Sequence, residues 1–299
     1  MRPRLFCFGL GYAALVLARR LMALGWSVTG TVRQASRADE LAALGIDACL
    51  FDQDHSLPSA ALEGVTHLLT SVPPTATGDP VLAGAGEAVR AACARGLGWI
   101  GYLSTTAVYG DWGGDWVDET SPLRPTSDRA RRRVDAETAW LDLGRQQGCA
   151  VQVFRLAGIY GPGRNVLEDV KAGTARRIVK PGQVFSRIHV DDIAATLQAS
   201  MDHPRAGGVY NVCDDEPAPP QDVIAYAATL LGVAPPPEEA YDPAALSAMA
   251  QTFWADNKRV SNQLLHRELG VALNYPGYRQ GLQALLSNRD ASSKNSAAT

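Results

Sequence analysis

Short, almost wholly apolar stretches alternate along the first half of the chain with longer stretches in which apolar side chains recur every three or four positions. The short stretches are typical of parallel strands buried on both faces, and the longer ones of helices that cover such a sheet. The pattern predicts strands at residues 4–8, 27–32, 47–51, 65–71, 99–104 and 150–156. It predicts helices from Tyr12 to the turn at Gly25 and at 35–44, 81–95 and 131–147. We therefore expect an α/β fold with a Rossmann-type, doubly wound parallel sheet.

The pattern loosens after Gly158, where turns rich in proline and glycine separate shorter helices. These helices are predicted at 190–201, 221–231, 261–269 and 279–286. We assign residues 1–158 to the Rossmann domain and 159–287 to a smaller C-terminal substrate lobe interleaved with the sheet. Residues 288–299 are rich in alanine, serine and asparagine and have no apolar periodicity, which predicts a disordered tail.

The net charge of -3, with acidic and basic residues interspersed, provides no extended basic face for nucleic acid. One local basic run, Arg129 and residues 131–133, is followed by Asp135 and Glu137, which can pair with it across one helical turn. No apolar stretch approaches the roughly 20 residues that span a bilayer. The first strand begins almost at the start of the sequence and leaves no room for a signal peptide, so we expect a cytoplasmic location and no membrane partner.

The five cysteines are scattered, mostly within apolar segments, and show no C-x-x-C spacing. They are Cys7, Cys49, Cys93, Cys149 and Cys213. We expect reduced core residues, with neither a disulfide framework nor a metal site.

A glycine-rich turn joins the first strand to the first helix, with the sequence G-L-G-Y-A-A at residues 9–14. The first glycine permits a sharp turn, and the second lets the backbone approach a phosphate closely. The N-terminus of the following helix presents unpaired N–H groups to an anion. We assign Gly9, Leu10, Gly11 and Tyr12 to the pyrophosphate site of a dinucleotide, with an ordinary tight turn as the alternative.

Arg33 follows the second strand, where proteins that bind NAD usually carry an acidic residue for the ribose hydroxyls. A guanidinium there, helped by Arg37, suits the 2′-phosphate of NADP, so we expect NADP in preference to NAD. The alternative is that Arg33 is a solvated residue at a strand end. Asp52, after the third strand, could accept a hydrogen bond from the adenine amino group or serve an ordinary turn.

Six segments in a fixed order resemble the extended short-chain dehydrogenases/reductases of the NAD-dependent epimerase/dehydratase family. They are residues 9–14, LSTTAVYG at 103–110, Glu119 with Pro122 and Pro125, RLAGIYGPG at 155–163, HVDD at 189–192 and GVYNV at 208–212. The resemblance runs over nearly the whole chain. It implies a Rossmann sheet of about seven parallel strands and a lobe that closes over a substrate, in most relatives a nucleotide-linked sugar. It also allows a homodimer.

In that family a Ser or Thr, a Tyr, and a Lys four residues after the Tyr act together. The Tyr exchanges a proton with the substrate hydroxyl, and the Lys lowers the pKa of the Tyr. Thr105 occupies the Ser/Thr position. Glu137 matches the acid that follows the Lys by four residues, which places Arg129 at the Tyr position and Arg133 at the Lys position.

This replacement is the main departure from the family pattern. A guanidinium cannot donate and accept a proton near neutral pH, so Arg129 cannot do the work of the phenol. The G-x-G-x-x-A turn also departs from the usual G-x-x-G-x-x-G spacing. Both departures resemble the atypical members of the family, several of which lack a complete catalytic set.

The catalytic candidates are therefore Thr105, Tyr109 and Arg133. Tyr109 lies four residues after Thr105 and could donate a proton, although in the family this Tyr is usually structural. Arg133 could still hold a ribose or phosphate, and we place Arg129 with it in the cofactor cleft.

The substrate candidates are Tyr160, Arg187 and His189, because the resemblance brings the segment around Arg187 and His189 close to substrate phosphates. The alternative is that His189 packs at a strand end while Asp191 and Asp192 stabilise the first turn of the next helix.

We thus expect an NADP-binding, epimerase-like or oxidoreductase protein with a small-molecule substrate, a nucleotide-linked sugar being the class that the resemblance implies. Any hydride transfer would depend on Thr105, Tyr109 and water. The competing class is a non-catalytic module that senses NADP(H) for a protein partner.

Overall fold

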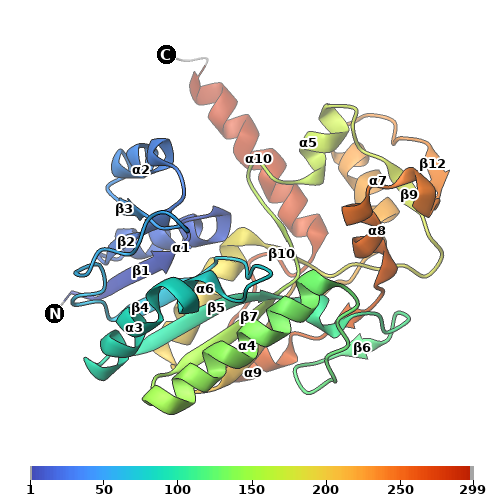
Figure 1. Ribbon diagram of the computed structural model, residues 1–299. Helices are drawn as coiled ribbons and strands as arrows, with labels where there is room; N and C mark the ends of the chain where they lie inside the picture. Colours follow the sequence, from blue (N-terminus) through green and yellow to red (C-terminus); the bar gives the residue numbers. More distant parts are fainter. Residues whose placement is uncertain (1, 297–299) are drawn as a thin grey trace.

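The computed structural model describes the backbone of residues 2–296 and the side chains of residues 2–287. Its centre is a sheet of seven parallel strands in the order β3-β2-β1-β4-β5-β7-β11 (Figure 1). The strands are β1 (Arg4–Phe8), β2 (Ser27–Val32), β3 (Asp47–Leu50), β4 (His67–Thr70), β5 (Trp99–Thr105), β7 (Val151–Leu156) and β11 (Gly208–Val212). The predicted Rossmann-type, doubly wound sheet is therefore confirmed.

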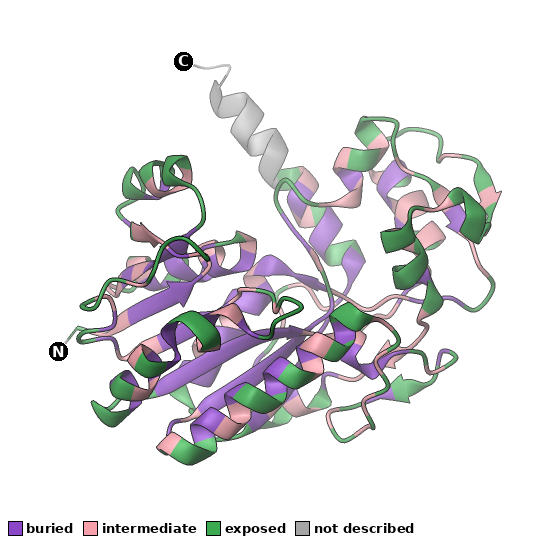
Figure 2. Ribbon diagram, in the orientation of Figure 1, coloured by how far each residue is buried: buried purple, intermediate pink, exposed green. Residues whose placement is uncertain are grey.

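Helices cover both faces of this sheet. One face packs against α1 (Tyr12–Ala23), α2 (Ala35–Ala42), α6 (Val190–Asp202) and α9 (Gln263–Leu269), and the other against α3 (Pro80–Ala94) and α4 (Asp128–Gln147). Successive side chains of a strand point to opposite faces, so Leu5 and Cys7 enter the α1 side while Phe6 and Phe8 enter the α3 side. Because both faces are buried (Figure 2), the central strands are continuous apolar runs in the sequence.

The register brings the carboxyl ends of the central strands to one level. Phe8 of β1 pairs with Thr70 of β4, and Thr70 pairs with Tyr102 of β5. The segments that follow these strands therefore share one edge of the sheet, namely the turn at Gly9, the loop after β4, and the 3-10 helix η1 (Thr106–Tyr109). In open α/β folds, ligands bind at this edge.

A second, smaller lobe has its own apolar core. It comprises α5 (Val166–Lys171), β9 (Arg177–Val179), α7 (Pro220–Leu230), β12 (Glu238–Ala240), η2 (Pro243–Ala245), α8 (Ala248–Ala255) and α10 (Tyr278–Ser296). Its core gathers Leu167, Val223, Ala227 and Leu282 around the rings of Tyr160 and Tyr278. Short strand pairs form near its junction with the sheet: β8 (Gly158–Tyr160) with β10 (Arg187–His189), and β6 (Trp116–Val117) with β13 (Arg259–Val260).

Helix α10 is longer than the helix predicted at 279–286. It ends at Ser296 and so enters the segment 288–299 for which the composition predicts a disordered tail. A helix that has started continues with one hydrogen bond for each added residue, even where the apolar pattern has ended. Residues 297–299 of the predicted tail lie outside the described residues. Between residues 2 and 296, no helix is long and apolar enough to cross a membrane.

Two of the cysteines form a disulfide, so the prediction of reduced thiols is wrong for this pair. Cys93 lies in the last turn of α3 and Cys149 in the loop between α4 and β7, and their Cα atoms are 5.9 Å apart. They are 56 residues apart in sequence, and only the packing of both segments at the same end of the sheet brings them together. Cys7, Cys49 and Cys213 are free.

Candidate functional site

The glycine turn is held against the neighbouring strands by backbone and side-chain bonds. The Gly9 N–H donates to Thr31 Oγ1 at 3.0 Å, and the Leu10 N–H donates to the Thr31 carbonyl at 3.0 Å. Gly9 has a φ of 81°, and a Cβ at this position would lie 2.9 Å from Ser71 Oγ. Position 9 therefore requires glycine both for its backbone conformation and for its contact with the loop after β4.

The N-terminus of α1 leaves its first amide groups without a partner from the described side chains. No side chain caps α1, and its first turn contains no acidic residue. By contrast, α3, α4 and α5 begin with the capping side chains of Asp79, Ser127 and Asn165. Gly11 is exposed, and a Cβ built on it would meet no atom within 4 Å. The turn thus forms an open cradle of N–H groups, and the pyrophosphate of a dinucleotide fits it.

The residues predicted for the adenosine half lie at the ends of β2 and β3. Arg33 is exposed and forms no hydrogen bond or ion pair with another described side chain, whereas Arg37 pairs with Glu40. Asp52 accepts hydrogen bonds from His55 Nδ1 at 2.8 Å and from the Asp54 N–H at 2.9 Å. These bonds, with that from His55 foremost, lower the pKa of the Asp52 carboxyl. The sequence left two roles open for Asp52, a hydrogen bond to adenine and a place in a turn. In this structure Asp52 has the turn role.

A buried ion pair anchors the middle of α4 to β7. The guanidinium of Arg155 donates to both carboxylate oxygens of Glu137, with Nη2 2.8 Å from Oε2. Ser104 at the end of β5 donates to the same carboxylate. Glu137 therefore faces the sheet, with Arg133 one turn and Arg129 two turns earlier on α4.

Tyr109 is enclosed in this network and does not face a ligand cleft. Its hydroxyl donates to Asn211 Oδ1 at 2.7 Å and accepts from Arg155 Nη1 at 2.9 Å, and its side chain is 0% exposed. Burial raises the pKa of Tyr109 to about 12, although the charge of Arg155 acts in the opposite direction. The predicted alternative role as proton donor is not supported, because the phenol is inaccessible and both of its partners are buried in the protein.

Arg133 points into the protein and not into the cleft. It is 9% exposed, and its Nη1 donates to the Leu103 carbonyl at 2.8 Å and to the Tyr102 hydroxyl at 3.0 Å. This geometry contradicts the prediction that Arg133 holds a ribose or phosphate, because its guanidinium already binds β5. Arg129, one turn earlier, is exposed and forms no hydrogen bond or ion pair with the described residues.

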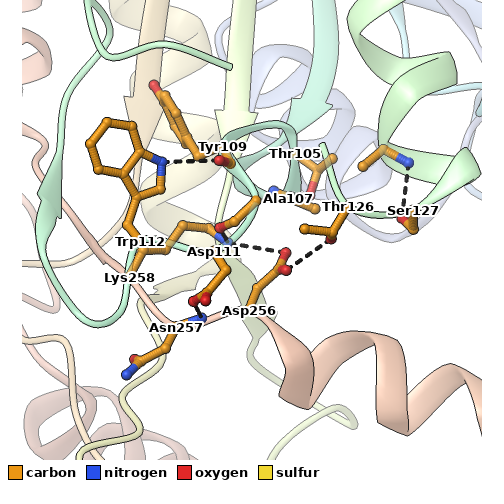
Figure 3. Close-up of polar contacts among 12 residues, drawn as sticks. Thr105, Ala107, Tyr109, Asp111, Trp112, Thr126, Ser127, Asp256, Asn257 and Lys258 are labelled. Atoms are coloured by element: carbon orange, nitrogen blue, oxygen red, sulfur yellow. Dashed lines mark hydrogen bonds and ion pairs between the residues drawn. The ribbon is translucent and has the colours of Figure 1, made fainter. Parts of the chain in front are cut away.

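Thr105, the predicted Ser/Thr member of the family motif, lies at the carboxyl end of β5. It is the last residue of β5, is half-buried, and accepts a hydrogen bond from the Ala107 N–H at 3.2 Å through Oγ1. This bond caps η1, which packs against α4. Thr105 is therefore held by the turn that follows β5, close to the start of the helix that carries Arg129 (Figure 3).

Three consecutive residues of the second lobe bind the loops around Thr105 (Figure 3). Asp256 accepts from Thr126 Oγ1 at 2.8 Å, the Asn257 N–H donates to Asp111 Oδ1 at 2.8 Å, and Lys258 Nζ donates to the Gly110 carbonyl at 2.8 Å. Burial lowers the pKa of the Lys258 ammonium, and Asp256, 3.4 Å away, opposes this effect. The sequence analysis missed this clasp, which we define as residues 256–258. The short polar run after α8 was its only sequence signal.

The predicted substrate residues do not all face one cavity. Tyr160 and His189 are 8% and 1% exposed, and their rings pack edge to face with centroids 5.2 Å apart. His189 accepts from the Asp191 N–H through Nδ1 and so caps α6, which is the packing alternative left open by the sequence. Tyr160 and His189 are therefore packed within the protein, and their substrate role stays a prediction.

Arg187 differs from these two residues because part of its side chain remains accessible. Its Nη1 donates to the carbonyls of Phe185 at 2.8 Å and Ala218 at 3.1 Å. Burial lowers the pKa of the Arg187 guanidinium, and the nearby Asp214 carboxylate opposes this effect. Arg187 is therefore the predicted substrate residue best placed to bind an anion. Within the described part of the chain, no group of three or more His, Cys, Asp or Glu side chains could hold a metal ion.

Comparisons with known proteins found a matching family model, curated relatives and similar solved structures. The model of the NAD dependent epimerase/dehydratase family matches residues 9–213. A solved structure of a functionally unknown conserved protein from Silicibacter pomeroyi DSS is 52% identical and covers 96% of this chain and 99% of its own, with a TM-score of 0.89. Protein YeeZ of Escherichia coli K12 is 31% identical over 239 residues, 76% of this chain and 84% of YeeZ. The 3-diazoavenalumate denitrifying reductase of a Streptomyces species is 30% identical over 298 residues, 89% of this chain and 94% of the reductase.

Proposed function

The chain belongs to the NAD-dependent epimerase/dehydratase family, and on that premise we propose that it binds NADP(H) and transfers a hydride to or from a small-molecule substrate without the Tyr and Lys of the family. The cofactor of this family is a nicotinamide dinucleotide, NAD or NADP. The observation that carries the proposal is the open cradle at residues 9–12, at the carboxyl edge of a Rossmann-type sheet.

The cradle accounts for the central part of the cofactor. The first-turn amides of α1 would hold the pyrophosphate, because they have no capping side chain and no nearby acid on their own helix. Glycine at positions 9 and 11 keeps this approach free of side-chain atoms. The residues at positions 9–12 are those that the glycine-rich sequence pattern predicts for the pyrophosphate site.

Arg33 favours NADP over NAD. Its guanidinium is exposed at the end of β2 and has no partner among the described residues, so it is available for a 2′-phosphate. Arg37 is already paired with Glu40 and is less available. Asp52 and Arg129 are the remaining residues of the predicted cofactor set, although Asp52 is already bonded to His55.

The chemistry proposed for this chain is limited to what its residues can do. The bound nicotinamide supplies or accepts the hydride. The Thr105 hydroxyl would donate a hydrogen bond to the reacting oxygen of the substrate, and water would exchange the proton. Tyr109 and Arg133 take no part in this proposal, because both are buried and bonded to the protein.

The substrate is proposed to carry an anionic group, as a nucleotide-linked sugar does. Arg187 of the second lobe would bind that anion through the donors that its bonds to Phe185 and Ala218 leave free. The relative that is named a reductase aligns with 89% of the chain and favours net reduction over epimerisation. A homodimer and a cytoplasmic location stay predictions.

Titration with NADPH, with Gly11→Asp as the matched variant, tests the proposal. A Cβ at position 11 would have no atom within 4 Å, and Asp is a favoured residue at a helix N-cap, so this variant should fold like the wild type. Its carboxylate would stand in the cradle and should weaken NADPH binding by about 30-fold or more, equivalent to about 2 kcal/mol. Equal affinity of the two proteins, or no binding by the folded wild type, would contradict the proposal.

The burial of Tyr109 and Arg133 also favours a second candidate, a non-catalytic NADP(H) sensor. The two candidates differ in turnover. Candidate nucleotide-linked sugars are added with NADPH, and the absorbance of the reduced nicotinamide is followed. Consumption of NADPH supports the enzyme, whereas binding without consumption across the substrate panel supports the sensor.

A further inference from the structure

A turn of the second lobe rests on the first residue of α1. The Tyr12 hydroxyl donates to the Pro162 carbonyl at 3.0 Å. Gly161 permits this contact, because a Cβ at that position would lie 2.5 Å from the Tyr12 hydroxyl oxygen. The turn at residues 161–164 therefore touches the residue whose backbone opens the pyrophosphate cradle.

The turn is internally fixed, so its position beside α1 does not depend on Tyr12 alone. The N–H of Gly161 donates to the Arg164 carbonyl at 2.9 Å, and the N–H of Arg164 donates back to the Gly161 carbonyl at 3.0 Å. Asn165 Nδ2 also donates to the Gly161 carbonyl at 2.9 Å while the same side chain caps α5. These hydrogen bonds fix the backbone from which the Arg164 side chain extends.

Arg164 is a cation next to the cradle and free to bind a ligand. Its guanidinium carbon is 5.9 Å from the centre of the Tyr12 ring, and its side chain is exposed. Its guanidinium forms no hydrogen bond or ion pair with the described residues. Burial is the main cause that raises the pKa of Tyr12. The charge of Arg164 lowers this pKa, and the charge of Asp191 raises it. Asp191, on α6, is the acidic group of this neighbourhood and does not pair with Arg164.

We propose that Arg164 binds the pyrophosphate of the dinucleotide from the side opposite the α1 amides. This inference rests on the proposed function, and it adds a residue of the second lobe to the cofactor site. A guanidinium can donate two parallel hydrogen bonds to phosphate oxygens, which backbone amides at a helix end complement from the other side. Cofactor binding would then link the two lobes through the turn at residues 161–164.

The experiment measures the dissociation constants of NADPH and NADH for the wild type, Arg164→Gln and Arg33→Gln. Both dinucleotides contain the pyrophosphate, so Arg164→Gln should weaken both by the same factor, about 10- to 100-fold for a charge-assisted contact. Arg33→Gln should weaken NADPH alone, because only NADPH carries the 2′-phosphate. Arg145→Gln, an exposed arginine at the far end of α4, is the matched control and should change neither affinity.

Each outcome has a distinct meaning. Unchanged affinities in Arg164→Gln overturn the inference while the proposed function stands. A loss confined to NADPH also overturns it, because Arg164 would then contact the 2′-phosphate. If the folded wild type binds neither dinucleotide, the proposed function fails first.

Two further variants separate binding from folding. Arg164→Lys keeps the charge but loses the two-pronged donor, so it should restore part of the affinity for both dinucleotides. Tyr12→Phe removes only the bond to Pro162 and should cause a smaller, equal loss for both. Thermal unfolding of every variant is compared with that of the wild type, to show that each variant is folded. A full loss of affinity in Arg164→Lys without any change in Arg164→Gln would contradict the proposal.

Discussion

Helices α1 and α4 both begin at the ligand-binding edge of the sheet, but their buried sides have opposite chemistry. The buried side of α1 is wholly apolar and consists of Ala13, Ala14, Leu17, Ala18 and Leu21. The buried side of α4 includes Arg133 and Glu137 together with Ala130, Ala136, Trp140 and Leu143. A helix with a purely apolar buried side needs only shape complementarity, whereas α4 also needs every buried charge to have a partner.

The N-termini of α1 and α4 also differ in how far the protein itself occupies their amide groups. The first turn of α1 has no cap and no acid, so its amides remain available to a ligand. The first turn of α4 is capped by Ser127, which accepts from the Ala130 N–H, and it contains the acidic Asp128, so it is less open to an anion. In this chain, the start of α1 is open for the proposed cofactor, while the buried positions of α4 maintain the fold.

The largest effect that tests this comparison is expected from Glu137→Ala. It leaves the guanidinium of Arg155 buried without its carboxylate, which should lower the free energy of unfolding by about 3–5 kcal/mol. Urea denaturation measures the loss. Leu17→Ala, on the buried side of α1, provides the apolar reference at about 3 kcal/mol. A loss below about 1 kcal/mol for Glu137→Ala would show that the α4 ion pair is dispensable.

The next effect concerns the end of α4. Replacing both Cys93 and Cys149 by alanine removes the cross-link between α3 and the loop after α4, and the free energy of unfolding should fall by about 2–4 kcal/mol. The cause is the larger conformational freedom of the unfolded chain, since the bridge closes a long loop. Comparison of oxidised and reduced wild type by urea denaturation should reproduce the loss. Two free thiols at these positions in the purified, non-reduced protein would contradict the disulfide.

The smallest effect is expected at the start of α4. Arg129→Gln changes an exposed residue without a partner among the described residues, so the free energy of unfolding should stay within about 0.5 kcal/mol of the wild type. Arg133→Gln, one turn later, should cost about 1–3 kcal/mol because the Leu103 carbonyl loses its donor. Equal losses in the two variants would contradict the difference in burial.

Much of the fold could be predicted from the sequence because its signals are local. Strands buried on both faces are continuous apolar runs, and β1, β2 and β7 lie within a residue of their predicted positions. The glycine turn was equally predictable, since a sharp turn before a helix has a short sequence pattern.

The catalytic candidates were less predictable, because their roles depend on which way a side chain points. Tyr109 and Arg133 occupy plausible positions in the motif, yet both point into buried hydrogen-bond networks. Lys258 had only the short polar run after α8 as a signal, and Arg164 was not among the predicted site residues, because each is close to its candidate partner only through contacts between the two lobes.

By itself, the sequence determined the parallel α/β sheet and the glycine turn before α1, because apolar periodicity and glycine spacing are properties of short segments. Only the tertiary structure decided which polar groups are buried and which remain free, including the disulfide, the clasp at residues 256–258 and the place of Arg164 beside Tyr12. These features join residues that are far apart in the chain, and their partners are selected by the packing of whole elements rather than by local preference.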